Sequence, residues 1–350
     1  MRRSLWLSLA AIPVLLVEAA CVSGNPAASG PGEGVQNAQV SINAAGATFP
    51  AAIYQKWFNE FKGAKINYQS LGSGAGIQQL TQGTVDFGAS DMPMKDVQIA
   101  AMKVQPLHFP TVLGAVVPVY NIPGVPTDLK FTQDALAGIY LGEIKLWNDP
   151  KIAAENQGVK LPNAEIITVH RSDGSGTTFI WTEYLSKISP GWKSKVGVNS
   201  SVSWPVSGLA GKGNEGVAGT VKQTPNSIGY VELIYAVQNR LSYGKVQNAA
   251  GNFINPDSAS LTAAAAAGAK AILSDFRAAL TNPHGDNAYP ISSYTWILIS
   301  KNGSITKQEA MKDFLRWVLN QGQSYVEPAG FARLPPAIIE QELKEIEEIP

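Results

Sequence analysis

Apolar residues recur at helical spacing in some segments of the chain and run together or alternate in others. In "IYQKWFNEF" the residues Ile53, Trp57 and Phe61 stand four apart, which predicts a helix. "KINYQS" (65–70) follows as a short strand, and "IQQLTQG" and "VDFGAS" repeat the order of helix and strand. This alternation favours an α/β fold.

The second half of the chain continues the alternation. "TQDALAGIY" predicts a helix capped by Thr132, and the strand "EIITVH" precedes the helix "TTFIWTEYL". "AKAILSDFRAAL" places the apolar residues of 272–280 on one helical face, between the strands "NSIGYVELIYA" and "YTWILIS". Thr306 and Glu309 predict a capping box, and "PPAIIEQELKEIEEI" is expected to be the last helix, with proline at its start.

One apolar run, "FPTVLGAVVPVYN" (109–121), is too continuous for a strand with one exposed face. It predicts a long buried strand. We expect this strand to cross between two lobes.

The N-terminus has the pattern of an export signal. "MRRS" is basic, the segment from Leu5 to Val17 is apolar, and "EAAC" follows. The apolar segment is shorter than the roughly 20 residues of a membrane-spanning helix, so we expect residues 1–20 to be a signal peptide. Residues 21–38 are rich in Gly, Pro, Ser and Asn, which predicts a flexible linker.

Cys21 lies just after the apolar segment, where bacterial lipoproteins are cleaved and acylated, so it is a candidate for lipidation. Glu18 stands three residues earlier, at a position that is normally aliphatic in such signals. Cleavage by an ordinary signal peptidase after Ala19 or Ala20 is the alternative. The mature protein is expected in the periplasm or on the outer face of the cytoplasmic membrane.

Charge and composition exclude several classes of function. Lys plus Arg equals Asp plus Glu at 27 each, without a dense basic block, so nucleic acid is not an expected partner. Cys21 is the only cysteine and the three histidines are scattered, which excludes an intrachain disulfide and leaves little for a metal site. We expect no cofactor, no metal and a monomeric chain.

The glycine-rich segments match no nucleotide-binding or hydrolase motif. "GSGAGI" (72–77) has isoleucine where a dinucleotide fingerprint has its third glycine, and "GLAGKG" (208–213) is not a P-loop. A nucleophile elbow has glycine two residues before its serine, whereas Leu71 precedes Ser73 and Asp173 precedes Ser175. Enzyme activity is therefore not expected.

Four glycine-rich or small-residue stretches instead follow predicted strands and open predicted helices. They are "AGATFP" (45–50), "LGSGAG" (71–76), "FGASDMP" (87–93) and "RSDGSGT" (171–177). Each suits a turn when taken alone. Together they would supply helix N-termini, whose first N–H groups have no partner within the helix and attract anions.

The side chains of these stretches fit a tetrahedral oxyanion, because a buried anion needs many hydrogen-bond donors. Thr48, Ser73, Ser175 and Thr177 supply hydroxyl groups, and Arg171 supplies a planar guanidinium. Asp173 can orient that guanidinium. Its alternative role is to cap the helix that follows.

Asp91 is the informative exception, because a carboxylate beside an anion repels it unless the anion has a proton to donate. Phosphate carries such a proton near neutral pH and sulfate does not. A site with an obligate acceptor therefore favours phosphate, and sites of this kind discriminate by roughly 10⁴ to 10⁵. The alternative is that Asp91 only caps a helix beginning near Met92.

These motifs resemble the phosphate-binding proteins of bacterial phosphate-specific ABC importers. "AAGATFPAAIY", "VDFGASDMP", "IYLGEIKLWND", "HRSDGSGTTF", "GKGNEGVAG" and "SIGYVE" stand in the order of that family, and the resemblance extends from about Ala44 to the 330s. It implies a type II periplasmic-binding-protein fold of two α/β lobes joined by two crossover strands. Lobe I would hold residues 39–115 and 286–345, and lobe II residues 116–285.

The resemblance also implies that phosphate is bound between the lobes and delivered to the membrane permease. The implied contacts are Thr48, Phe49 through its backbone N–H, Ser73, Asp91, Arg171, Asp173, Ser175, Gly176 and Thr177. Gly74 departs from the family pattern, which commonly has a second serine there. Two rivals stay open: a secreted phosphatase using the same anion cradle, and a receptor for another oxyanion such as sulfate or molybdate.

Overall fold

A computed structural model of the chain describes residues 39–125 and 128–350. These residues, from Gln39 onward, form one compact unit. The predicted signal peptide (1–20), the predicted linker (21–38) and the candidate lipidation site Cys21 lie outside the described residues.

The first part of the sheet, here called the first sheet region, consists of β2, β1, β3, β12 and residues 106–115 of β4, in that order. β1 (Ser41–Gly46) lies parallel to both β2 (Lys65–Ser70) and β3 (Phe87–Ser90). β12 (Ser292–Ser300) runs antiparallel to β3 and to β4 (Pro106–Asn121). The region is therefore a mixed sheet.

The second sheet region consists of residues 116–121 of β4 with β8, β6 and β7, and β9 (Ser242–Tyr243) pairs with the other edge of this part of β4. β8 (Ser227–Glu232) is antiparallel to β4, whereas β6 (Ile167–Arg171) is parallel to both β8 and β7 (Leu209–Gly211). A small separate sheet joins β5 (Lys130–Phe131), β10 (Lys245–Gln247) and β11 (Phe253–Ile254).

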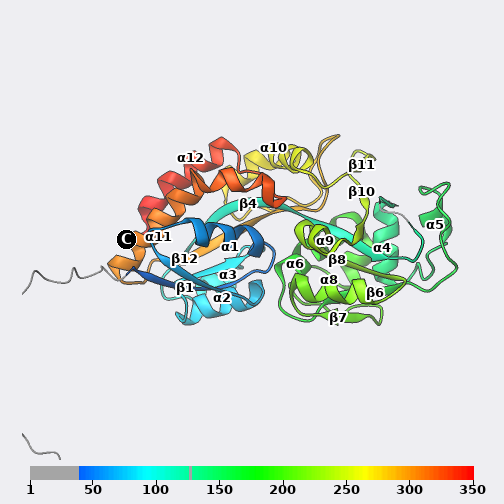
Figure 1. The fold of residues 1–350 in the computed structure, drawn as a ribbon, viewed down its shortest axis with the longest axis horizontal. Coiled ribbons are helices and arrows are strands. Elements are labelled where there is room, and N and C mark those ends of the chain that lie inside the picture. Colours follow the sequence, from blue (N-terminus) through cyan, green and yellow to red (C-terminus); the bar gives the residue numbers. More distant parts are fainter. Residues whose placement is uncertain (1–38, 126–127) are drawn as a thin grey trace, which may run out of the picture. The chain divides into compact units, whose positions relative to one another are not determined.

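β4 connects the two sheet regions, as the apolar run 109–121 predicts. Figure 1 shows it extending from the group that contains β12 and α2 to the group that contains β8 and α8. It changes partners between Ala115, paired with Ser292, and Val116, paired with Glu232. The chain returns through residues 275–291, which have no regular secondary structure, and the Val116 N–H donates to the carbonyl of Ile291 at 2.9 Å.

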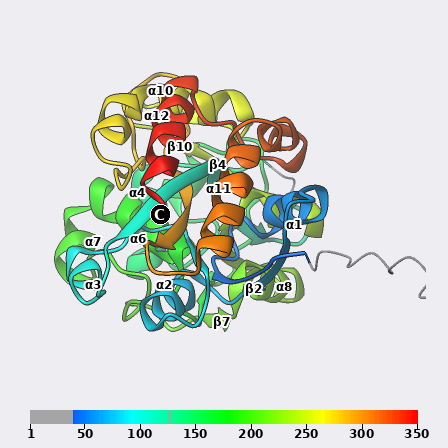
Figure 2. The ribbon, with the colours of Figure 1, turned by 90° about the vertical axis from the view of Figure 1, so that its left-hand side faces the viewer.

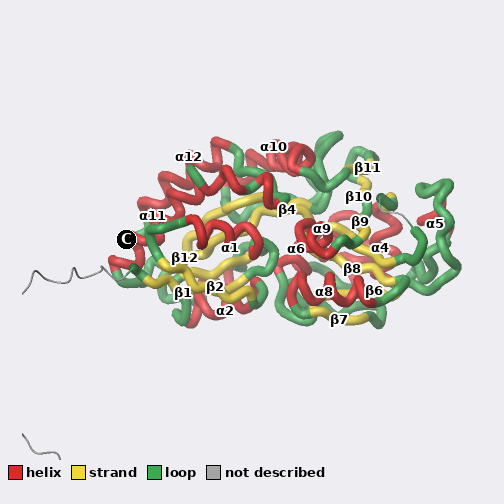
Figure 3. The backbone as a smooth tube through the Cα atoms, viewed as in Figure 1, coloured by secondary structure: helices red, strands yellow, loops and turns green. Residues whose placement is uncertain are grey.

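Helices lie on both sides of the strands (Figure 3). Those around the first sheet region are α1 (Ala51–Glu60), α2 (Ser73–Gln82), α3 (Asp96–Ala100), α11 (Ile305–Leu319) and α12 (Pro336–Glu345). The others are α4 (Gln133–Leu141), α5 (Pro150–Ala153), α6 (Gly176–Ile188), α7 (Pro190–Lys195), α8 (Gly213–Gln223), α9 (Leu233–Asn239) and α10 (Ser258–Ser274). Short 3₁₀ turns cover Gly322–Tyr325, Glu327–Ala329 and Ile346–Glu348, and Figure 2 shows the C-terminal helices α11 and α12.

Each sheet region has its own aromatic cluster. Phe314 of α11 packs on Phe61, with ring centroids 5.2 Å apart, and on Phe58 at 5.7 Å. On the other side Trp181 of α6 stacks on Tyr230 of β8 at 5.1 Å. Aromatic pairs contribute about 0.5–1.5 kcal/mol beyond the area they bury, so each cluster stabilises its own part of one continuous apolar core.

Most predicted elements are confirmed. The strand at 65–70 is β2, Thr132 caps α4 by accepting the N–H of Ala135 at 3.0 Å, and a proline starts α12. The predicted α/β fold is also confirmed, because helices and strands alternate along the chain and the strands form a mixed sheet.

Four local predictions are wrong. The strand expected in "NSIGYVELIYA" ends at Glu232, and α9 begins at Leu233. α10 ends at Ser274, because the Asp275 side chain instead accepts the N–H of Arg277 in a turn. No capping box forms at Thr306, since α11 has Ser304 at its N-cap and no side-chain cap. The fourth concerns "FGASDMP", which ends β3 but opens no helix until Asp96.

Among the described residues no helix is long and apolar enough to cross a membrane.

Candidate functional site

The candidate residues follow the carboxyl ends of parallel strands in both sheet regions. In the first region Gly46 lies opposite Ser70 of β2 and Ala89 of β3, so the loops after these strands meet at one edge. In the second region Arg171 of β6 lies opposite Gly211 of β7. This edge of an α/β sheet is where ligands commonly bind.

The two edges touch each other across the site. The Gly74 N–H donates to the carbonyl of Gly174 at 2.9 Å. Gly72 has a φ of 97°, and a Cβ there would overlap the Asp173 carboxylate. A Cβ on Gly176 would overlap the Ser73 hydroxyl and lie 2.7 Å from Asp91 Oδ2. Glycine at 72 and 176 therefore lets the two regions approach.

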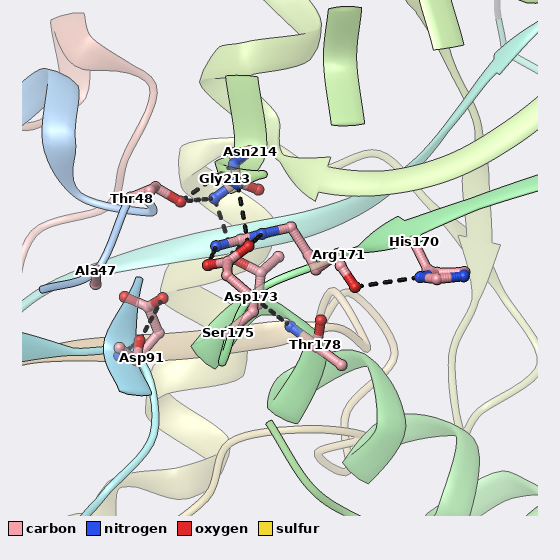
Figure 4. A network of polar contacts seen from close by, with 12 residues as sticks. Ala47, Thr48, Asp91, His170, Arg171, Asp173, Ser175, Thr178, Gly213 and Asn214 are labelled. Atoms are coloured by element: carbon pink, nitrogen blue, oxygen red, sulfur yellow. Dashed lines mark hydrogen bonds and ion pairs between the residues drawn. The ribbon is translucent and has the colours of Figure 1, made fainter. Parts of the chain in front are cut away.

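Arg171 is held in place by Asp173. Its Nε donates to Asp173 Oδ1 at 2.8 Å and its Nη2 donates to Oδ2 at 2.6 Å, a bidentate pair (Figure 4). Its Nη1 donates to the hydroxyl of Thr177 at 3.3 Å. The guanidinium is buried, so its charge acts in a region of low dielectric.

Asp173 orients Arg171 as predicted, and the alternative that it caps the next helix is wrong. The cap of α6 is Ser175, whose hydroxyl accepts the N–H of Thr178 at 3.0 Å. Asp173 Oδ1 also accepts the N–H of Gly213 at 3.1 Å. Burial alone would raise the pKa of Asp173, but the hydrogen bonds and positive charge of Arg171 outweigh it and hold the pKa below its usual value.

Thr48 faces the second sheet region from the loop after β1. Its hydroxyl accepts the backbone N–H of Asn214 at 3.2 Å and the Asn214 side-chain Nδ2 at 2.7 Å (Figure 4). The carbonyl of Thr48 accepts the hydroxyl of Tyr235 at 2.6 Å. Thr48 is therefore bonded to the opposite region at both its side chain and its backbone.

Ser73 and Asp91 form a second polar group at the edge of the first region. The Ser73 hydroxyl accepts the backbone N–H of Asp91 at 3.0 Å and donates to Asp91 Oδ2 at 3.3 Å. Asp91 Oδ1 accepts the hydroxyl of Thr295, from β12, at 2.9 Å. Asp91 is 2% exposed, so hydroxyl groups stabilise a carboxylate that is almost wholly removed from water.

The alternative that Asp91 caps a helix near Met92 is wrong, since the next helix, α3, starts at Asp96 after Lys95. Burial raises the pKa of Asp91 to about 7, although the Thr295 hydrogen bond and the charge of Arg171 act in the opposite direction. A carboxyl group with such a pKa exchanges a proton readily near neutral pH.

Phe49 has a structural role besides its predicted backbone contact. Its ring is fully buried and lies 6.1 Å from that of Phe331. The N-termini of α1 and α2, which follow Phe49 and Gly72, have no side-chain cap. The Ala51 and Gly74 N–H groups donate to the carbonyls of Thr48 and Gly174, and the other N–H groups of each first turn are suited to an anion.

The structure brings seven of the nine predicted site residues into contact, directly or through Asn214, while Phe49 and Ser175 adjoin Thr48 and Gly176 in the sequence. Arg171, Asp173 and Thr177 are bonded directly, Asn214 joins Thr177 to Thr48, and Gly176 adjoins Ser73 and Asp91. The sequence predictions missed Asn214, Gly213 and Thr295. "GKGNEGVAG" contains Asn214, but only the fold reveals its contacts.

Ser73 and Ser175 have no arrangement typical of a nucleophile. Ser73 bonds to Asp91, and Ser175 accepts an amide hydrogen as a helix cap. No cluster of three or more His, Cys, Asp or Glu residues suited to a metal occurs within 39–125 and 128–350.

Two larger cavities lie away from these residues. One of about 640 Å³ is lined by residues of α2, β12 and α11, including Asp86 and Lys307. The other, of about 370 Å³, lies between α4 and the residues around Thr168. Neither cavity contains the polar groups that converge at the two sheet edges, and a small anion enclosed by two touching edges needs little space.

Comparison with known proteins places this arrangement in a family. Residues 31–321 match the family model described as a PBP superfamily domain. The chain is 47% identical over 308 residues to the phosphate-binding protein PstS of Pasteurella multocida, covering 86% of this chain and 88% of the relative. It is 40% identical over 352 residues to PstS of Methanocaldococcus jannaschii, covering 93% and 89%.

Solved structures show the same fold. A high affinity periplasmic phosphate-binding protein bound with phosphate has a TM-score of 0.71 at 21% identity, over 87% of this chain and 93% of that chain. The phosphate-binding protein from Stenotrophomonas maltophilia has a TM-score of 0.71 at 19% identity, over 87% and 94%.

Proposed function

Because the chain belongs to the PBP superfamily and, within it, to the family of the phosphate-binding proteins PstS, we propose that it binds inorganic phosphate for import by an ABC transporter. One observation supports the proposal most directly. Hydrogen-bond donors from both sheet regions converge beside Asp91, whose carboxylate can accept further hydrogen bonds. The relatives are binding proteins, which agrees with a role that involves no catalysis.

The ligand contacts in this proposal are Thr48, Phe49, Ser73, Asp91, Arg171, Asp173, Ser175, Gly176 and Thr177. Arg171 supplies positive charge, the hydroxyls and helix N-termini supply hydrogen bonds, and Asp91 shares one proton with the anion. A phosphate with a proton satisfies Asp91, whereas sulfate leaves two negative oxygens facing each other.

Phosphate would be enclosed by closure of two lobes, residues 39–115 with 286–345 and residues 116–285. The change of partners in β4 at residues 115 and 116 supports the first boundary. Contacts to both lobes make the ligand favour the closed population.

The remaining parts of the proposal are cellular. The signal sequence 1–20 would direct the chain across the cytoplasmic membrane, and Cys21 would be the point of lipid attachment after cleavage there. The protein would then act as a monomer that delivers phosphate to the permease subunits.

Isothermal titration calorimetry on the chain from Gln39 onward tests the proposal. We expect one phosphate per chain and no displacement by sulfate or molybdate at a hundredfold excess. Absence of heat with phosphate, or equal competition by sulfate, would reject it.

The variant Asp91→Asn tests the role of the shared proton. An amide can donate a hydrogen to sulfate, so the preference for phosphate should fall by at least about 10²-fold. An unchanged preference would mean that another group performs the discrimination.

A further inference from the structure

Asn214 spans the two sheet regions. It is fully buried near the start of α8, and its side-chain Nδ2 donates to Thr48 at 2.7 Å and to Thr177 at 3.1 Å. We propose that Asn214 is a positioning residue that forces these two threonine hydroxyls to donate their hydrogens to the bound anion. This inference rests on the proposed function and assigns a role to a residue outside the predicted contacts.

The acceptor capacity of Thr48 is used up. A hydroxyl oxygen has two lone pairs and one hydrogen. Both lone pairs of Thr48 Oγ1 are taken, one by the backbone N–H and one by the side-chain amide of Asn214. Its hydrogen is thus the remaining group for a ligand.

Both lone pairs of the Thr177 hydroxyl are taken as well. Its Oγ1 accepts Nη1 of Arg171 at 3.3 Å and Nδ2 of Asn214 at 3.1 Å. The two hydrogens of the Asn214 amide therefore serve the two threonines, one on each side of the site. Both hydroxyls become obligate donors, which suits unprotonated oxygens of an anion.

The orientation of the Asn214 amide is fixed by its own partner. Its Oδ1 accepts the backbone N–H of Glu232 at 3.0 Å, at the end of β8. A flipped amide would face that N–H with its own hydrogens and the threonines with its oxygen. The fixed orientation therefore sets the polarity of both hydroxyls.

This arrangement links closure to recognition. Asn214 reaches Thr48 only when the second sheet region touches the first, so the Thr48 hydroxyl is aligned by closure itself. The proton of the ligand is then directed away from both threonines and toward Asp91, which retains acceptor capacity.

A double-mutant cycle on phosphate affinity tests the proposal, with Asn214→Ala and the nearly isosteric Thr48→Val as its single variants. Asn214→Ala should weaken phosphate binding about 10- to 100-fold in the wild-type background. In the Thr48→Val background, Asn214→Ala should weaken phosphate binding less than about tenfold. Part of the effect of Asn214 depends on the Thr48 hydroxyl, which this background lacks. Equal losses in both backgrounds would overturn the proposal.

Asn214→Asp is the second variant. It keeps an acceptor for Glu232 but cannot donate to the threonines, so it should bind phosphate more weakly than Asn214→Ala does. Binding as tight as in the wild type would overturn the role of Asn214 even if Asn214→Ala failed to fold.

Asn156→Ala is the matched control. Asn156 is also a buried asparagine, and its Nδ2 donates to the carbonyls of Lys130 and Ile152 at 2.9 and 2.8 Å, away from the site. It should lower the unfolding temperature and leave phosphate affinity within twofold; an equal loss of affinity in Asn156→Ala and Asn214→Ala would overturn the proposal. Wild type that does not bind phosphate rejects the proposed function itself, whereas binding with an additive cycle rejects only the role of Asn214.

Discussion

At the scale of single residues, the two carboxylates of the site have opposite environments, and Asp91 is buried whereas Asp173 is only partly buried. Asp173 is bonded on both oxygens by Arg171 and receives a further N–H from Gly213, so its charge is matched. Asp91 is bonded only by hydroxyls and lies where burial raises its pKa to about 7. Asp173 therefore orients Arg171, whereas Asp91 is the group that can accept a proton from the ligand.

Without phosphate, Asp91 should make stability depend on pH. Its pKa rises from 3.8 in the unfolded chain to about 7 in the folded one, so the folded state binds more protons between these values. Its contribution is fully present below pH 4 and is lost as the pH rises through 7, on the order of 4 kcal/mol at 1.36 kcal/mol per unit. Asp91→Asn should therefore become more stable relative to wild type as the pH rises from 4 to 8.

Thermal unfolding of both proteins in phosphate-free buffer measures this difference. A gap between the two unfolding temperatures that stays constant from pH 4 to pH 8 would show that Asp91 keeps an ordinary pKa.

The residues of the site were predictable to the extent that they occupy local motifs. Thr48, Ser73 and Arg171 each follow a strand in a glycine-rich stretch, so their chemistry is visible in short quoted segments. Asn214 contacts Thr48 across 166 positions of sequence. Only the fold brings them together, and no local spacing indicates that contact.

At the scale of elements, helix N-termini are central to the site. α1 and α2 begin there without side-chain caps, whereas α6 is capped by Ser175. The Ser175 hydroxyl accepts the N–H of Thr178, which leaves its own hydrogen for a ligand. One serine can thus stabilise the helix and donate to the anion.

Ser175→Ala should have two effects. Loss of the cap should lower the free energy of unfolding by about 1 kcal/mol. Loss of the donor should weaken phosphate binding about tenfold. Chemical denaturation and calorimetry measure the two separately.

Ser189→Ala is the control, because Ser189 caps α7 by accepting the N–H of Trp192 at 3.1 Å. It should lose similar stability with unchanged affinity. Equal affinities of the two variants would mean that Ser175 acts only as a cap.

Elements with a strong local signal were predicted well, and tertiary contacts decided the others. α1 and β2 follow the spacing of their apolar residues, and α4 follows its Thr132 cap. The helix expected to continue to residue 280 ends at Ser274, the last residue of α10. The carbonyl of Phe276 instead accepts the indole N–H of Trp296 at 2.6 Å. After β8 the apolar segment 233–239 turns into a helix, since Glu232 caps it by accepting the N–H of Ile234.

At the scale of the whole described chain, the site exists only where the two sheet regions meet. Gly74 bonds to Gly174, Thr48 bonds to Asn214, and Arg277 pairs with Asp96 of α3 at 2.7 Å. The long apolar run predicted a crossing strand, and β4 provides it. How closely the edges approach depends on side-chain size, which the motifs alone do not indicate.

Gly176→Ala should keep the first and second sheet regions from closing on each other. Its methyl group would overlap the Ser73 hydroxyl and crowd Asp91 in the closed arrangement. Overpacking of this kind costs about 1–3 kcal/mol, so phosphate affinity should fall about 10- to 100-fold. The unfolding temperature without phosphate should not fall, because an open form relieves the overlap.

Gly219→Ala provides the comparison, since Gly219 lies in α8 with no atom within 4 Å of an added Cβ. Its affinity should equal that of the wild type. Unimpaired binding by Gly176→Ala would mean that phosphate does not require the two regions to touch at this point.

The most direct measurement of the central claim is a crystal structure of the chain grown with phosphate. We predict tetrahedral density between the two sheet regions, within hydrogen-bond distance of Arg171, Thr48 and Thr177, with one oxygen against Asp91. Phosphate bound at another place, with these four residues turned away from it, would contradict the account.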